Sequence, residues 1–186
     1  MRNALILAAL ALCCGCGRVP QVHYYDLVLD APAPAAAPQP ATLWVQPFSA
    51  LPPSEQDRMV YRDSVSEIQF DAYRRWIAAP PELLRERLVA WLRASGRFSA
   101  VVTALPRREA CTTLAVQLVR FEETAESGQR EAVTRFWYEL TDAEGGRLGS
   151  GYIEGRAVIP PGSAAALIAA MRDSAARAFA QLLERL

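Results

Sequence analysis

The C-terminal half of the chain constrains the fold most, because three segments with strand character follow one another there. Residues 114–121 have the clearest strand pattern, and residues 133–141 and 148–158 follow it. Residues 142–146 read Asp-Ala-Glu-Gly-Gly, which is typical of a hairpin turn between the last two strands. A sheet of this kind must bury one face against another layer. The sequence therefore predicts a three-stranded meander that needs helices to cover it.

Two predicted helices can supply that cover. The first begins at residues 80–82, since proline suits a first turn and the Glu82 carboxylate complements the helix dipole, and it ends at Gly96. Its apolar residues share one face: Leu84, Leu88, Trp91 and Leu92. The second helix follows Ser163, the expected N-cap, and continues to the C-terminus. Its apolar stripe comprises Ile168, Met171, Ala175, Ala178, Leu182 and Leu186.

The N-terminal half carries shorter segments of strand character. We expect strands at residues 22–29, 42–48, 59–62, 67–70 and 98–102. The Pro/Ala-rich residues 31–41 are expected to form an extended loop, because proline cannot donate a hydrogen bond to a strand ladder. The order of elements predicts one α+β domain over residues 22–186, with a mostly antiparallel sheet and two main helices packed on one face.

The charge composition excludes some classes of function. The chain has 20 basic and 20 acidic residues, so its net charge at pH 7 is zero. This balance gives no reason to expect a nucleic-acid partner. Every basic residue is arginine, but the arginines are spread along the chain, which favours a compositional bias of the source genome over a phosphate site.

The first residues resemble the signal of a bacterial lipoprotein. A positive residue, Arg2, precedes nine apolar residues, which are too few to span a bilayer as a helix. Gly15 then precedes Cys16, and in such signals a small residue precedes the cysteine that is lipidated after cleavage. We therefore predict a signal peptide at residues 1–15, lipidation of Cys16, and a short tether at residues 16–21. Cys14 stays open as an alternative, because Cys13 occupies the position where these signals usually have leucine.

The sequence offers no convincing metal site or catalytic set. Cys13 and Cys16 form one Cys-x-x-Cys pair, but the only histidine is His23 and, apart from the adjacent Cys14, the only other cysteine is Cys111. We therefore expect no metal, no cofactor and no disulfide. Cys111 is expected to be a small apolar residue at the entry of a strand, with a reactive thiol as the less favoured interpretation. No nucleophile has a plausible base, so we expect no enzymatic activity.

A candidate recognition surface lies within residues 133–140. Alternation sends one apolar set of side chains to one face of the predicted strand: Phe136, Tyr138 and Leu140. The other face carries Arg135, Trp137 and Glu139. A tryptophan between charges on a solvent face would be an interface anchor, so we predict Trp137 as a partner-binding residue with Arg135 and Glu139 as its polar rim. A loop that covers this face is the alternative.

The ordered motifs resemble those of the ABC-type transport auxiliary lipoprotein family, which includes the paraquat-inducible lipoproteins. These motifs are the lipoprotein cysteine, a Tyr-Tyr-x-Leu element at residues 24–27, LWVQPF at 43–48, MVYR at 59–62 and YRRWIAAPPELL at 73–84. The resemblance implies a periplasmic lipoprotein held in the outer membrane. It also implies a non-catalytic role, in which the protein docks a mammalian-cell-entry (MCE) domain protein and, through it, an ABC permease and an ATPase that move lipids between membranes.

Other interpretations of the sequence stay open. Gly17, rather than aspartate, follows Cys16, which favours the outer membrane over retention at the inner membrane. An outer-membrane assembly lipoprotein of the lipopolysaccharide-assembly type would also be a small α+β domain on a lipid anchor. An enzyme with an unrecognised site is a further alternative, and the chain could form a homo-oligomer.

Overall fold

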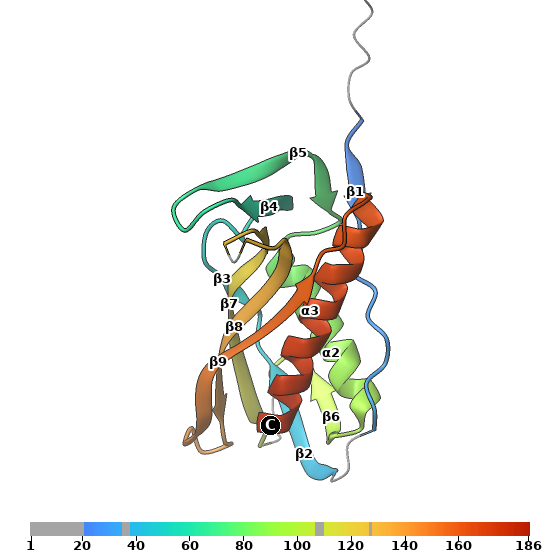
Figure 1. Cartoon of the computed structure of the whole chain (residues 1–186). Helices are drawn as coiled ribbons and strands as arrows, with labels where there is room; N and C mark the ends of the chain where they lie inside the picture. Colours follow the sequence, from blue (N-terminus) through green and yellow to red (C-terminus); the bar gives the residue numbers. More distant parts are fainter. Residues whose placement is uncertain (1–20, 35–37, 107–109, 127) are drawn as a thin grey trace, which may run out of the picture.

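The computed structural model describes residues 21–34, 38–106, 110–126 and 128–186. Within these ranges the chain forms a nine-stranded sheet and two long helices (Figure 1). The elements in chain order are β1 (His23–Tyr25), β2 (Gln39–Val45), β3 (Ser49–Ala50), β4 (Arg58–Arg62), β5 (Ile68–Trp76), α2 (Pro80–Ser95), β6 (Phe98–Val102), β7 (Thr112–Thr124), β8 (Glu131–Thr141), β9 (Arg147–Val158) and α3 (Ala164–Arg185).

Strand β7 lies at the centre of the sheet and has two different edges. Along one edge β8 pairs antiparallel over nearly the whole strand, and β9 pairs antiparallel with β8. Along the other edge β2, β3 and β4 lie one after another, and each pairs with β7 in the parallel direction. Beyond them, β6 extends the sheet next to β2, and β5 and then β1 extend it next to β4. The α+β class and the mostly antiparallel sheet are confirmed, and the short parallel pairs were not predicted.

Both helices cover the same face of the sheet. The ring of Phe179 in α3 stacks on Phe136 of β8, with 5.9 Å between ring centroids. The same ring lies 6.0 Å from Trp91 of α2, so one side chain joins the sheet to both helices. The predicted apolar stripe of α3 is buried, except that Ile168 is only partly buried. Helix α2 ends as expected at Gly96, whose φ of 63° is the left-handed conformation that glycine adopts without strain.

A bulge in β7 decides which side chains enter the core. The register with β8 shifts between Leu118 and Arg120, so Val119 is the extra residue. Strict alternation would place Arg120 on the same face as Leu118. The bulge instead turns Phe121 into the core, where its ring lies 5.0 Å from the buried Trp76, and turns Arg120 to the opposite face.

Helix α3 also covers part of the outer edge of β9. The Gln181 side chain bonds both the N–H and the C=O of Glu154, and Arg177 donates to the C=O of Arg156. Such an approach requires glycine at position 155, because a Cβ there would lie 1.9 Å from the backbone oxygen of Ser174. The edge is thereby protected from pairing with another strand at these residues.

Several predicted boundaries in the N-terminal half were wrong, among them the end of β5, which continues to Trp76 rather than stopping at residue 70. Strand β1 ends at Tyr25 rather than at residue 29, because the Asp26 carboxylate accepts the N–H of Leu27 and binds Arg87 of α2, and Leu27 is buried. Strand β2 begins at Gln39, inside the expected Pro/Ala loop. Its register with β6 is irregular between residues 39 and 42, which accommodates Pro40 because proline has no N–H to give. Strand β3 was not predicted.

Candidate functional site

The face of β7, β8 and β9 that points away from α2 and α3 is called the open face here. Strand β8 carries the three predicted partner-binding residues onto it: Arg135, Trp137 and Glu139. All three side chains are half-buried. In the ladder Trp137 lies between Gln117 of β7 and Tyr152 of β9, and Tyr152 is 57% exposed. Two aromatic side chains therefore lie next to each other on a face that no helix of the described residues covers.

Arg135 is held against this aromatic pair. Its guanidinium carbon lies 4.7 Å from the centroid of the Tyr152 ring, a cation–π contact, and its Nη1 lies 3.8 Å from a carboxylate oxygen of Glu154. The sequence did not reveal Tyr152 or Glu154 as members of the site. They come from β9, and only the register of β8 against β9 places them opposite Trp137 and Arg135.

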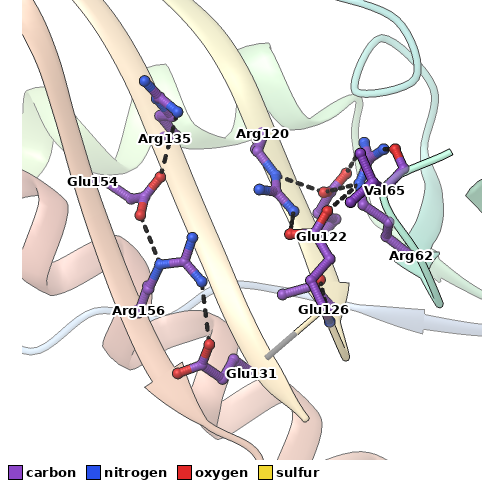
Figure 2. A network of polar contacts seen from close by, with 10 residues as sticks. Arg62, Val65, Arg120, Glu122, Glu126, Glu131, Arg135, Glu154 and Arg156 are labelled. Carbon is purple, nitrogen blue, oxygen red and sulfur yellow. Dashed lines mark hydrogen bonds and ion pairs between the residues drawn. The ribbon is translucent and has the colours of Figure 1, made fainter. Parts of the chain in front are cut away.

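The ion pair of Arg135 and Glu154 is part of a series of ion pairs that runs along the open face (Figure 2). Arg156 donates through Nε to Glu154 at 2.6 Å and through Nη1 to Glu131 at 3.1 Å. The hydrogen bond to Glu154 is the largest cause that raises the pKa of Arg156, and it outweighs the opposing effect of burial. Each of these pairs is partly exposed and contributes little stability alone. Together they fix the positions of alternating charges beside the aromatic pair.

A second network on the open face surrounds a buried carboxylate (Figure 2). Glu122 of β7 is 1% exposed and accepts hydrogen bonds from two arginines: Nε of Arg62 at 2.7 Å and Nε of Arg120 at 2.6 Å. Both arginines also pair with Glu126, at 3.7 and 3.1 Å. The bond to Glu122 raises the pKa of Arg62 more than burial lowers it. Because Arg62 belongs to β4, this network ties that short strand to β7.

These contacts connect the side chains of the open face, over which no helix of the described residues lies. Val133 of β8 is fully buried there, between Glu122 and Arg156 in the two ladders. Its burial shows that the long side chains of the two networks cover the sheet. The surface therefore presents fixed charges around an accessible aromatic pair, which is the composition of a protein recognition site.

Over residues 21–34, 38–106, 110–126 and 128–186, no group of three His, Cys, Asp or Glu side chains could hold a metal ion. Over the same ranges, neither helix is long and apolar enough to cross a membrane. Cys111 is a free, half-buried thiol immediately before β7, at the entry of a strand as expected. Cys16 and its alternative Cys14 lie outside the described residues.

Comparison with known proteins gives one family. The sequence profile of the ABC-type transport auxiliary lipoprotein component matches residues 25–183, which is most of the chain. No curated protein sequence matches the chain.

Solved structures share the fold at low sequence identity. Protein XCC0632 from Xanthomonas campestris superposes with a TM-score of 0.78 at 20% identity, covering 87% of this chain and 92% of that one. An uncharacterized protein gives a TM-score of 0.72 at 17% identity, with 88% and 97% covered. The hypothetical protein CT253 from Chlamydia trachomatis gives 0.58 at 8% identity, with 79% and 95% covered. These similarities support the fold alone.

Proposed function

Because the chain belongs to the ABC-type transport auxiliary lipoprotein family, we propose that it is the non-catalytic docking subunit of a transport system that moves lipids between two membranes. Its direct partner in this proposal is a periplasmic MCE-domain protein, which connects it to an ABC permease and an ATPase. The accessible aromatic pair Trp137 and Tyr152, held in a rigid frame of ion pairs, is the observation that carries the proposal.

The proposed anchor is the lipid on Cys16. Residues 1–15 would be removed as the signal peptide, residues 16–21 would form the tether, and residues 22–186 would form the domain in the periplasm at the outer membrane. A lipid-anchored subunit beside an ABC-type transporter needs a surface for another protein more than it needs a reactive group. The open face supplies such a surface.

The chemistry of the open face suits protein recognition. Tryptophan, tyrosine and arginine are the residues that most often dominate binding energy at interfaces. Arg135 is already oriented by Tyr152 and Glu154, so little side-chain entropy is lost when a partner binds. Glu139, two residues further along β8, supplies an acceptor on the other side of Trp137. The alternation of charges favours one orientation of the partner.

The docking proposal is tested with Trp137→Ala. Loss of a tryptophan hot spot typically costs 2 kcal/mol or more, which corresponds to an affinity for the MCE protein that is roughly thirtyfold weaker. The control is Leu105→Ala, because Leu105 is a large apolar residue as exposed as Tyr152 but lies in the loop after β6. Both variants should keep the circular dichroism spectrum of the wild type. Unchanged affinity in Trp137→Ala would remove the open face from the proposal.

The anchor is tested separately by mass. Cys16→Ala should abolish acylation, whereas Cys14→Ala should leave it intact, because the small Gly15 precedes only Cys16. Intact-mass spectrometry of the membrane fraction distinguishes the two cysteines. An acylated Cys16→Ala protein would assign the lipid to Cys14.

A further inference from the structure

Exposed apolar side chains gather where the N-terminal part of the chain enters the sheet. They are Val22, Tyr24, Tyr73 and Ile77, and together they are called the β1–β5 outer face. Tyr24 is 62% exposed and Ile77 is 54% exposed, so no described part of the chain covers them. In Figure 1 this region, with β1, the end of β5 and the start of α3, lies at the top of the molecule.

The pairing of β1 with β5 explains why these side chains share a face. Tyr25 lies opposite Trp76, and both belong to or pack against the core. Their neighbours Tyr24 and Ile77 therefore point to the other side, since side chains alternate along a strand. The ladder continues past the strand end, because the N–H of Ile77 bonds the C=O of Tyr25 at 3.0 Å. The β1–β5 pair thus has one buried face and one exposed apolar face.

The charges beside this face are already neutralised. Arg74 binds Asp71 at 2.6 Å, and Arg75 lies 3.4 Å from Asp57. A highly charged partner therefore finds no unmatched charge at these two arginines. The remaining chemistry is apolar and phenolic, and tyrosine side chains of this kind concentrate at the boundary between lipid headgroups and hydrocarbon.

The length of the tether limits what can lie against the face. Val22 is six residues after Cys16, and an extended chain spans at most about 3.6 Å per residue, so this edge of the face stays within roughly 20 Å of the anchored cysteine. A lipid on Cys16 would hold that cysteine at the bilayer surface. The β8–β9 turn and the C-terminus lie at the opposite end of the molecule in Figure 1.

We propose that the β1–β5 outer face rests on the phospholipid surface in which the Cys16 lipid is inserted, with Tyr24 and Tyr73 at headgroup level. This inference rests on the lipid anchor of the proposed function. Contact at two points, the lipid and the β1–β5 outer face, fixes the tilt of the domain. A domain held by the lipid alone would rotate freely on its tether, whereas the two-point contact presents the open face in one orientation.

The test measures lipid contact in the acylated full chain. In a Cys111→Ala background, Ile77→Cys carries a single NBD fluorophore, and Leu148→Cys is the matched control. Leu148 is 58% exposed, like Ile77, but lies at the start of β9 beside the β8–β9 turn. The protein is reconstituted in two kinds of vesicle, neutral phosphatidylcholine and a 3:1 phosphatidylethanolamine/phosphatidylglycerol mixture, each containing a shallow nitroxide lipid.

We expect the nitroxide to quench the label at position 77 at least about twice as strongly as the label at 148, in both lipid compositions. The double variant Tyr24→Glu/Tyr73→Glu should reduce quenching at position 77 to the control value while acylation persists. Both tyrosines are exposed, so this variant should keep its melting temperature. Equal quenching at 77 and 148, or quenching only in vesicles with anionic lipid, overturns the inference. NBD fluorescence at position 77 that reports an apolar environment but is not quenched by the nitroxide also overturns it, and identifies a protein as the occupant of the face.

The outcome is separable from that of the docking proposal. Trp137→Ala should leave quenching at position 77 unchanged, since Trp137 lies on β8 and not on the β1–β5 outer face. Quenching in a chain that binds no MCE protein would support the inference and contradict docking. A chain without lipid on Cys16 would overturn the inference, whatever its affinity for the partner.

Discussion

The two faces of β8 differ although they come from alternate residues of one strand. Phe136, Tyr138 and Leu140 are buried under the helices, and Phe136 stacks on Phe179. Arg135, Trp137 and Glu139 lie on the open face, which is ordered by ion pairs between β8 and β9. The covered face therefore supplies stability by burial, and the open face takes its rigidity from the same backbone. A surface on the back of a packed sheet can therefore be ordered without a core of its own.

The largest expected difference between the faces is in stability. Phe136→Ala removes a ring that contacts Phe48 and Phe179, and should lower the free energy of unfolding by about 3–5 kcal/mol. Trp137→Ala, one residue along, should lower it by less than about 2 kcal/mol, because its side chain is only half-buried. Urea unfolding measures both. Equal losses would show that the open face is part of the core.

The buried carboxylate tests whether the open face has an internal support. Glu122→Gln removes the buried anion that Arg62 and Arg120 share, leaving them only the partly exposed Glu126, and should cost about 2–3 kcal/mol. Glu123→Gln is the control on the same strand, since Glu123 pairs with the exposed Arg130 and its loss should cost less than about 1 kcal/mol. Thermal unfolding compares the two. A neutral Glu122→Gln variant would mean that the networks do not stabilise this face.

Gly155 tests the approach of the covering helix. A Cβ at this position would overlap the backbone oxygen of Ser174, so Gly155→Ala should force α3 away from β9 at a cost of about 1–3 kcal/mol. At Gly149 the nearest atom to a new Cβ is the Tyr138 hydroxyl at 3.8 Å, and Gly149→Ala should change stability by less than about 1 kcal/mol. Amide exchange of Glu154, whose N–H bonds Gln181, reports the displacement. Full protection in Gly155→Ala would contradict the close contact.

The smallest effect concerns a carboxylate outside the open face. Burial raises the pKa of Asp71, but bonds from the backbone N–H groups of Tyr73 and Arg74 and from the Arg74 side chain lower it more, so the net pKa falls. Its stabilisation is present above the unfolded pKa of about 4 and is lost as pH falls through the folded pKa. Asp71→Asn should therefore cost about 1 kcal/mol at pH 7 and progressively less below pH 4. A constant difference down to pH 2 would show that the carboxylate charge is irrelevant.

Local sequence patterns predicted the strands whose apolar and polar residues alternate and the helices whose apolar residues recur with the helical period. Alternation separated Phe136 from Trp137, and the helical period identified the stripe of α3, because each signal is contained in neighbouring residues. The turn at Gly96 was equally local. Such signals also placed the three candidate residues of β8 on one face.

Features that depend on register could not be predicted. The bulge at Val119 exchanges Arg120 for Phe121 in the core, and a short apolar run does not indicate where a bulge will fall. Tyr152 and Glu154 join the candidate site only through the pairing of β9 with β8. The parallel strands beside β7 come from distant segments, so no local pattern marks them. The early end of β1 follows from a long-range bond between Asp26 and Arg87.

The pairing of three short strands along one edge of β7 has a consequence for the order of folding. Strands β7, β8 and β9 and helix α3 are contiguous in sequence, so their contacts close short loops and can form early. Strands β2, β3 and β4 can complete their pairing only once β7 is made, because each takes its parallel partner from that strand. The β4–β5 hairpin is local and can form before then. We therefore expect the strands that are synthesised first to join the central strand last.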